Sequence, residues 1–416
     1  MNSLENLKYP KLTGRDVYLW GTGRQGRGLF RRLEALGLEV RGFLDTRAEV
    51  LPEKLVFGRP VSEPGPILAR GRTAEAPAIV VTPFFFQREL MAQAEAAGFI
   101  PGENLFALDQ LTPYSYAVDV SGLCNLHCLA CPRGKGRGPG RPGGLMKAET
   151  FSQVAEKIVK EDPLASSIQL YQWGEPLLNS DLPAIIDLAN RAGLAPAVSS
   201  NLNPRVDLAP VVAAKPAWFR ASLSGFGPGY EVTHTGGSWK QVSKSLENLA
   251  SLKAELNQDM KVEIFYHLYR HNRGAELAAA SDFCQALGFE FQPVWAYLIS
   301  LDEVLAWRET GRLPEEARRA ADLLEIDLET ALARARAEAS EGCLVENVIS
   351  VNWDLSVAHC MMFYHRQDNQ AAENFLALPL SEIQRLRAGS PLCGRCRSEA
   401  LHRYCQVYNT WPTEAA

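Results

Sequence analysis

The strongest constraint on the fold is a long alternation of helical and strand-like segments in the middle of the chain. Apolar residues repeat with the helical period in some segments and form short runs in others, from Ala148 to Tyr297. With an apolar run at Tyr116–Val120 they make six strand–helix units. Such alternation predicts parallel strands joined by right-handed crossovers. We expect helices over 149–160, 181–192, 207–214, 239–256 and 274–287, and strands over 116–120, 167–173, 195–200, 217–223, 261–269 and 289–297.

Three cysteines follow the first of these strands in a C-x3-C-x2-C spacing, at Cys124, Cys128 and Cys131. This spacing lets one loop present three thiolates to a single inorganic core, and sulfur ligands select iron–sulfur clusters, zinc or copper(I). A [4Fe–4S] core has four iron corners, so three ligands would leave one iron open to a non-protein group. The alternatives are a structural zinc loop that lacks one ligand, or three unrelated buried thiols.

Several segments in the same order resemble radical S-adenosylmethionine (SAM) enzymes. After the cysteine loop, Tyr171-Gln-Trp-Gly174-Glu175-Pro176 resembles the family's Gly-Gly-Glu-Pro segment, 194–203 its fourth strand and 221–225 its fifth. The resemblance covers about residues 116–297 and implies a partial (β/α)6 barrel of TIM type. The chain departs from the family at Ala130, where an aromatic residue is common, at Ser-Leu-Ser-Gly in place of Ser-x-Asp-Gly, and at His234 in place of an arginine.

The resemblance also implies site residues. SAM would bind an open iron of a [4Fe–4S] cluster held by the three cysteines, and one electron would cleave it to methionine and a 5′-deoxyadenosyl radical that abstracts hydrogen from the substrate. Glu175 and the Gly174 backbone would hold the methionine amino group, and Ser199 and Asn201 the ribose hydroxyls. Ser222 and His234 would contact the carboxylate and ribose. Because histidine titrates near neutral pH, we expect SAM affinity to weaken above about pH 7.

A second cysteine set lies near the C-terminus. Residues 347–352 and 354–359 predict a β-hairpin through Trp353, with Cys343 before it and Cys360 after it. Together with Cys393 and Cys396 this pattern resembles the twitch domain of radical SAM dehydrogenases, a shortened relative of the SPASM domain. That resemblance implies one auxiliary [4Fe–4S] cluster with four thiolate ligands, and a structural zinc is the alternative. We expect the remaining cysteines, Cys284 and Cys405, to be plain buried or free thiols.

The N-terminal segment has its own pattern. A strand at 16–20 is followed by Gly21-Thr-Gly23-Arg-Gln-Gly26, a helix over 29–36, a strand over 40–43 and Asp45. This is the dinucleotide fingerprint, in which glycines allow close approach of a phosphate and the acidic residue meets a ribose. The segment also resembles nucleotide-sugar-binding domains of some sugar-modifying acyltransferases and a domain of sugar C-methyltransferases. The alternative is a degenerate Rossmann-like fold that docks a partner and binds no nucleotide.

The expected class is therefore α/β, in four parts. These are a Rossmann-like domain at 1–112, a radical SAM partial barrel at 113–300, a linker of two helices at 301–342, and a twitch/SPASM-like domain at 343–416. Between the cysteine loop and the next helix lies a Gly/Pro-rich loop with four cations, which could hold a phosphate-bearing substrate or could simply be solvated. They are Arg133, Lys135, Arg137 and Arg141.

Composition excludes some classes. The net charge of −5 gives no basic field for nucleic acid, and no apolar run is long enough for a membrane span. The first residues contain no apolar core of a secretory signal, and nine cysteines favour metal ligation in a reducing cytosol. We therefore expect a cytoplasmic protein, with a flavodoxin- or ferredoxin-type electron donor as its partner.

Strand parity predicts a polar interior for the barrel. In 261–269 the residues of one parity, Glu263, Phe265, His267 and Tyr269, would face inward. His267 and Glu263 are candidate catalytic bases, with Tyr269 or Tyr171 as hydrogen-bond donors.

Two outcomes follow for a carbohydrate or nucleotide-linked substrate. They are two-electron oxidation, or epimerisation if Cys284 or Cys405 returns a hydrogen atom. A peptide- or protein-modifying maturase is the other enzymatic alternative, and an iron–sulfur scaffold or electron carrier is the non-enzymatic one.

Overall fold

The computed structural model describes residues 12–51, 54–83, 86–133, 143–365 and 367–408. The chain forms two compact units. The first joins the N-terminal part up to Ser115 with the segments Ala155–Ile168 and Leu188–Pro196, and the second contains the other described residues.

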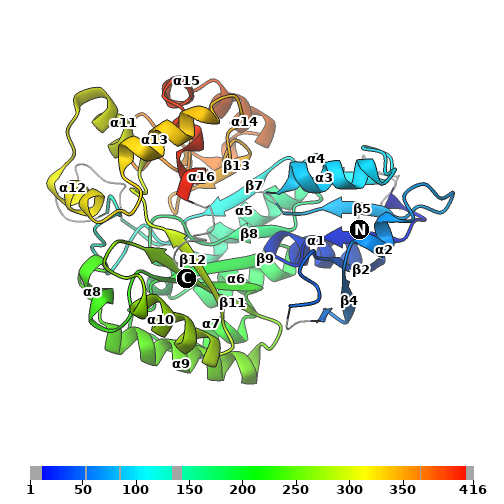
Figure 1. The fold of residues 1–416 in the computed structure, drawn as a ribbon, viewed down its shortest axis with the longest axis horizontal. Helices are drawn as coiled ribbons and strands as arrows, with labels where there is room; N and C mark the ends of the chain where they lie inside the picture. The colour runs from blue at the N-terminus through cyan, green and yellow to red at the C-terminus, as the bar shows by residue number, and fades with distance from the viewer. Residues whose placement is uncertain (1–11, 52–53, 84–85, 134–142, 366, 409–416) are drawn as a thin grey trace. The chain divides into compact units, whose positions relative to one another are not determined.

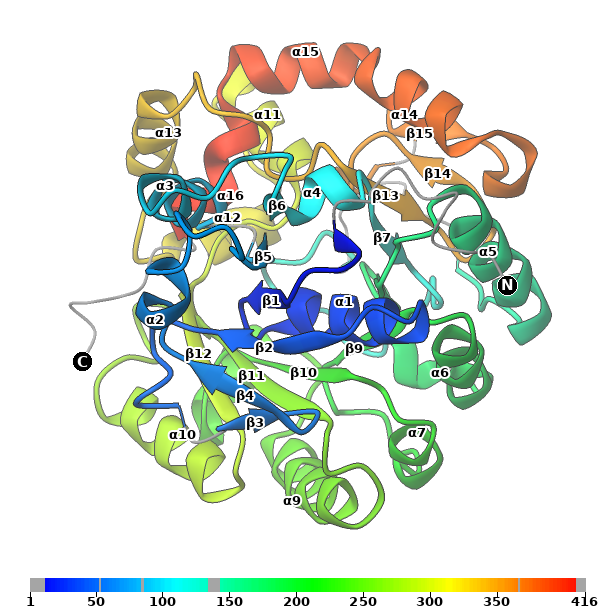
Figure 2. The ribbon, with the colours of Figure 1, turned by 90° about the vertical axis from the view of Figure 1, so that its right-hand side faces the viewer.

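The first unit is built on a sheet in the order β3-β4-β2-β1-β5-β6, which Figure 2 shows from its side. Strand β1 pairs in parallel with β2 and β5, β5 with β6, and β2 with β4, while β3 and β4 pair antiparallel. The bounds are β1 Val17–Trp20, β2 Val40–Leu44, β3 Leu55–Val56, β4 Arg59–Ser62, β5 Ala78–Val81 and β6 Leu105–Ala107. The helices are α1 Arg24–Ala35, α2 Gly65–Leu68, α3 Gln87–Ala96 and α4 Leu108–Leu111.

Alternating side chains of the central strands divide between two cores, as the twofold strand repeat requires. Val17 and Leu19 of β1 pack with Leu29 and Leu33 of α1. The neighbouring residue Trp20 packs with Leu90 of α3. Helices α1 and α3 therefore cover opposite faces of this sheet. The Rossmann-like arrangement expected from the glycine fingerprint is confirmed, whereas β3, β4, α2 and α4 were not predicted.

The second sheet has the order β12-β11-β10-β9-β8-β7-β13-β14-β15. Its first six strands follow the chain in reverse, and strands β7–β8, β9–β10, β10–β11 and β11–β12 pair in parallel. These strands are β7 Ser115–Val118, β8 Ser167–Gln169, β9 Ala195–Ser200, β10 Trp218–Leu223, β11 Lys261–Leu268 and β12 Glu290–Trp295.

Helices connect these strands, and all but the short α8 lie along their outer side (Figures 1 and 2). They are α5 Ala148–Glu161, α6 Leu182–Arg191, α7 Ala209–Ala213, α8 Tyr230–Thr233, α9 Trp239–Leu256 and α10 Ala275–Ala286. The strand order and the parallel pairings confirm the α/β class that the alternation predicts and the partial barrel that the resemblance implies. Strand β8 is shorter than expected, because from Leu170 onward the chain leaves the ladder toward the Gly174 segment.

Three helices follow the barrel where the sequence indicated two. They are α11 Leu301–Thr310, α12 Glu315–Asp322 and α13 Leu328–Ala337. Gly311 ends α11 in the left-handed region, with φ of 68°. The unpredicted break before α13 is a capping site, since the Asp327 carboxylate accepts a hydrogen bond from the Thr330 backbone N–H at 2.8 Å.

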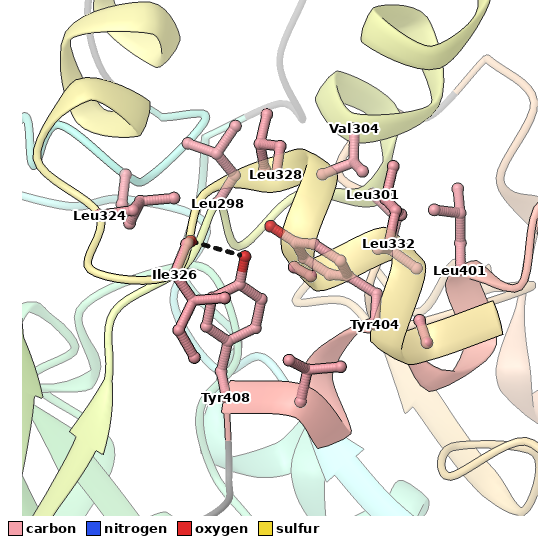
Figure 3. Packing of buried hydrophobic residues seen from close by; sticks show 14 of the residues in the cluster. Leu298, Leu301, Val304, Leu324, Ile326, Leu328, Leu332, Leu401, Tyr404 and Tyr408 are labelled. Carbon is pink, nitrogen blue, oxygen red and sulfur yellow. Dashed lines mark hydrogen bonds between the residues drawn. The ribbon is translucent and has the colours of Figure 1, made fainter. Parts of the chain in front are cut away.

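These helices share a buried core with the last helix, α16 Tyr404–Tyr408 (Figure 3). The Tyr408 hydroxyl donates to the Ile326 carbonyl oxygen at 3.3 Å, so this buried phenol has a partner. Leu298, from the end of the barrel, belongs to the same core as Leu328 and Leu332 of α13. Helices α11 and α13 are therefore packed against α16 and the barrel's end.

The hairpin through Trp353 is confirmed. Strand β13 Val348–Val351 pairs antiparallel with β14 Val357–Ala358, and β14 pairs with β15 Gln370–Ala372. Helices α14 Leu380–Ala388 and α15 Pro391–Ser398 follow. Cys393 and Cys396 lie on α15, while Cys343 precedes β13 and Cys360 follows β14.

Candidate functional site

The cysteine loop begins just after β7 and is held at its middle by main-chain hydrogen bonds. The His127 and Leu129 N–H groups donate to the carbonyls of Thr235 and Thr233 at 2.9 and 3.0 Å. Thr233 is the last residue of α8 and Thr235 follows it, so the loop is fixed to the segment that also carries His234. Each of the three thiols is partly buried.

The three thiols lie close enough to influence one another. Burial raises the pKa of Cys128 well above its usual value, and the neighbouring Cys131 and Cys124 raise it further. Burial likewise raises the pKa of Cys124. Thiols that crowd one another in a buried loop resist ionisation unless a positive centre compensates them. This arrangement fits an iron–sulfur core as the compensating centre.

No three His, Cys, Asp or Glu side chains of the described residues have the geometry of a site for one metal ion. A core of four iron atoms is larger than one ion, so its ligands stand farther apart.

Gly174 packs directly against the start of the cysteine loop. A Cβ at this position would lie 1.6 Å from the Ser121 carbonyl oxygen, so only glycine fits. The buried Asp119 carboxylate accepts from the N–H groups of Trp173 and Gly174 at 3.2 and 3.3 Å, and Glu175 N–H donates to the Leu123 carbonyl at 2.7 Å. Sequence reasoning missed Asp119, which ends the strand before the loop and fixes the Gly174 segment.

The Glu175 carboxyl is buried between two main-chain donors. It accepts from the N–H of Asn201 at 2.8 Å and from that of Leu177 at 3.0 Å. Burial raises its pKa to about 7, although these hydrogen bonds act in the opposite direction. The two donors neutralise only part of the burial penalty, so this carboxyl is suited to a cationic or proton-donating ligand group.

Asn201 links the Glu175 segment to the cysteine loop. Its side-chain amide donates to Asn125 at 3.1 Å and lies 3.8 Å from the Cys124 sulfur. On the adjacent strands, the hydroxyls of Ser199 and Ser222 are 3.5 Å apart. The structure thus brings Glu175 and Asn201 together beside Cys124, and Ser199 next to Ser222.

His234 is in a different state from the one the sequence suggested. It is buried, it stacks on Tyr230 with ring centroids 4.4 Å apart, and its Nδ1 contacts the Ser224 hydroxyl. Burial, together with the nearby His267, lowers its pKa to about 3. The ring is therefore neutral at ordinary pH, and the expected loss of SAM affinity above about pH 7 through its titration is wrong. Burial in the folded chain, which no motif reports, is the reason.

The two candidate bases have different hydrogen-bond partners. Glu263 is buried and accepts from Arg220 Nε at 2.8 Å, and the Arg220 guanidinium also lies 4.3 Å from the centre of the Phe265 ring. His267 donates from Nδ1 to the Leu223 carbonyl at 3.2 Å, which leaves Nε2 as the basic nitrogen. Burial lowers its pKa to about 4. His267 is thus the better-placed proton acceptor of the two.

The four C-terminal cysteines also gather. Burial raises the pKa of Cys360 to about 12, with smaller contributions from Cys343 and Cys393. Burial also raises the pKa of Cys396, and Cys360, Cys343 and Cys393 raise it further. These four thiols are buried or partly buried, and their charged forms would repel one another. Such a set fits a positively charged group that binds four thiolates.

The two remaining cysteines are also buried, and Cys405 is close enough to Cys343 and Cys396 for their charges to interact. Cys284 lies on α10 and Cys405 on α16, and burial raises the pKa of each to about 12. Such thiols are poor nucleophiles at neutral pH.

In the first unit, the fingerprint residues lie at one turn. Gly21 has φ of 122°, and a Cβ on Gly26 would lie 2.0 Å from the Gly21 carbonyl oxygen, so both glycines are required by the backbone. Gly23, by contrast, has open space where a Cβ would be. The Asp45 carboxylate accepts from the Thr22 hydroxyl at 3.0 Å, which places it beside the glycine turn.

The basic loop is only partly described. Arg133 donates to the Gly122 carbonyl oxygen, whereas Lys135, Arg137 and Arg141 lie outside the described residues.

No protein-family model matches the chain, and no curated protein matches its sequence. Among solved structures, anSMEcpe with bound AdoMet is 14% identical, with a TM-score of 0.44 over 72% of this chain and 92% of that chain. BtrN in complex with AdoMet and 2-DOIA is 14% identical, with a TM-score of 0.40 over 72% and 93%. Streptococcus suis SuiB bound to its precursor peptide SuiA is 15% identical, with a TM-score of 0.47 over 76% and 79%.

Within the described ranges, no helix combines the length and the apolar character needed to cross a membrane.

Proposed function

We propose that this protein is a radical SAM enzyme that acts on a carbohydrate or nucleotide-linked small molecule. One observation carries the proposal. The three thiols of the cysteine loop lie beside a buried carboxyl, Glu175, whose backbone is bonded to the same loop and whose oxygens are bonded to the Asn201 segment. An electron carrier would need the thiols and not the carboxyl.

The residues present fit the cofactors. Cys124, Cys128 and Cys131 would hold a [4Fe–4S] cluster, which supplies the electron that converts bound SAM into a hydrogen-abstracting radical. Glu175 would accept hydrogen bonds from the SAM amino group, because its present hydrogen bonds compensate only part of the cost of burying its charge. Asn201 and Ser199 would contact the ribose.

Ser222 and His234 would contact the carboxylate and ribose. As a neutral ring that touches Ser224, His234 would act as a hydrogen-bonding group rather than as a charge.

On the substrate side, His267 would remove the proton that accompanies oxidation. Its Nδ1–H is fixed to a carbonyl, so the tautomer with a free Nε2 lone pair is selected. The ion pair of Glu263 with Arg220 would order the wall of the site rather than accept the proton. Dehydrogenation is favoured over epimerisation, since Cys284 and Cys405 are both buried and so are not open to a substrate radical.

Cys343, Cys360, Cys393 and Cys396 would hold an auxiliary [4Fe–4S] cluster, with a flavodoxin- or ferredoxin-type protein as the external electron donor. In the first unit, Gly21, Gly23, Gly26 and Asp45 would bind a nucleotide. The open space at Gly23 supports this role, because nothing in the fold itself requires glycine there. The division into four domains and a cytoplasmic location remain predictions.

The experiment is anaerobic reconstitution with iron and sulfide, followed by SAM and dithionite. We expect 5′-deoxyadenosine from the wild type and none from Cys124→Ala, whereas Cys284→Ala, a buried thiol outside both sets, should behave as wild type. Cys393→Ala should retain 5′-deoxyadenosine formation and lose about four iron atoms. Wild-type protein that binds iron but does not cleave SAM would contradict the proposal. Turnover of a peptide and not of sugar nucleotides would favour the maturase alternative.

A further inference from the structure

A buried arginine stands beside the C-terminal cysteines. Arg387 lies on α14 and is 4% exposed. Its Nη1 donates to Gln384 at 2.6 Å, its Nε to the His359 carbonyl at 3.0 Å, and its Nη2 to the Val345 carbonyl at 3.3 Å. Each of these acceptors is neutral. A buried cation with only neutral acceptors is costly, unless negative charge lies close by.

The acceptors lie next to the cysteines in sequence. His359 immediately precedes Cys360, and Val345 is two residues after Cys343. The carbonyl of Arg387 itself lies 3.6 Å from the Cys393 sulfur, which donates to it. One residue therefore connects the three chain segments that carry three of the four thiols. Motif reasoning missed it, because Arg387 is outside every cysteine spacing.

The charge of Arg387 interacts electrostatically with the same thiols. Burial lowers the pKa of the Arg387 guanidinium, and the ionised forms of Cys360, Cys393 and Cys343 act to raise it. In turn, the charge of Arg387 acts to lower the pKa of Cys360 and of Cys393, which favours their thiolates. A carboxylate that also acts on it, Glu346, is already paired with Arg397 at 3.2 Å. Thiolates that hold a cluster would thus be the main compensation for this buried charge.

We propose that Arg387 is a positioning residue for the auxiliary cluster, and that its buried charge raises the reduction potential of that cluster. This inference rests on the auxiliary cluster of the proposed function. Reduction adds one electron and therefore one negative charge to a cluster with four thiolate ligands. A fixed cation beside it stabilises the reduced state more than the oxidised state. The hydrogen bonds to the carbonyls at 345 and 359 hold the thiolate-bearing segments in register around the group.

The test uses Cys124→Ala protein, so that the auxiliary cluster is observed alone, and follows its one-electron reduction by EPR in a redox titration. Arg387→Gln should lower the equilibrium constant for reduction at least tenfold, which is about 59 mV for one electron. Arg387→Lys keeps the charge and should stay close to the parent. Arg385→Gln removes an exposed arginine of the same helix, paired with Glu382, and should change nothing.

A second readout needs no cluster. In cluster-free protein, Arg387→Lys keeps the charge that favours thiolates, but an ammonium cannot reproduce the guanidinium's three-way bonding, so alkylation of Cys343, Cys360 and Cys393 should be at least tenfold faster than in the parent. Arg385→Gln should match the parent. If Arg387→Gln binds no iron, Arg387→Lys and the alkylation rates decide the question.

The outcomes separate the two claims. A parent protein without iron overturns the auxiliary site and this inference with it. A parent that holds about four iron atoms, with the same potential in Arg387→Gln, overturns the inference alone. Unchanged alkylation rates overturn the positioning role.

Discussion

The ionisation of Glu175 is linked both to folding and to cofactor binding. The pH dependence of stability and of SAM affinity therefore tests the assigned role of this residue quantitatively. Burial raises the pKa of this carboxyl from 4.5 to about 7. The folded chain thus holds the proton more tightly than the unfolded chain does, so stability falls as pH rises from about 4.5 through about 7. The complete shift corresponds to about 3 kcal/mol, at about 1.36 kcal/mol per pKa unit.

Glu175→Gln removes the titration while it keeps the shape of the side chain. The lost acceptor for one backbone N–H costs about 1–3 kcal/mol at every pH. Between about pH 5 and about pH 8, cluster-free wild type should therefore lose about 2.5 kcal/mol of stability relative to the variant. Glu247→Gln, which removes an exposed carboxylate on α9, should show no such trend. Thermal unfolding at the two pH values measures the difference.

Cofactor binding should respond in the opposite direction, because SAM needs the charged carboxylate. With a pKa of about 7 the charged fraction rises about tenfold between about pH 6 and about pH 8. The ratio of the SAM dissociation constant of Glu175→Gln to that of wild type should rise by about the same factor, since titration of SAM itself cancels in the ratio. A ratio that does not change with pH would refute the reasoning.

Three further predictions concern single side chains. Gly174→Ala should abolish 5′-deoxyadenosine formation, since its Cβ would overlap a backbone carbonyl, whereas Gly65→Ala, with open space, should be silent in the same assay. His267→Gln should lower substrate turnover about 10²–10⁴-fold while SAM cleavage without substrate persists. Because the pKa of His267 is about 4, its protonation should not lower wild-type turnover when the pH is reduced from about 8 to about 6. Equal losses in both reactions would contradict that role. Tyr408→Phe should cost about 1 kcal/mol in thermal unfolding through its lost hydrogen bond, and no change would show that the bond contributes nothing.

Much of the fold was readable from periodicity. The segments 195–200 and 239–256 have the predicted bounds, because their apolar periods dominate their local preferences. The break before α13 was not readable, since it depends on one capping aspartate within a continuous helical composition. The short strands β3 and β4 carry too few residues for a periodic pattern.

The site was predictable where a motif fixes the backbone and not where burial fixes the chemistry. The cysteine spacings and the Gly174–Glu175 segment were visible in the sequence. The neutral state of His234 and the buried cation Arg387 were not, because both depend on neighbours far away in the sequence, such as His267 and His359. Asp119 was missed for the same reason, since its partners are the backbone N–H groups of 173 and 174.

The central claim is that the cluster held by Cys124, Cys128 and Cys131 leaves one iron open for SAM. Electron–nuclear double resonance on the reduced protein with isotopically labelled SAM measures this directly. The account predicts hyperfine coupling between the cluster and the labelled amino and carboxylate groups, which is absent in Cys124→Ala. A cluster that forms and shows no coupling to bound SAM, or a zinc ion in its place, would contradict the account.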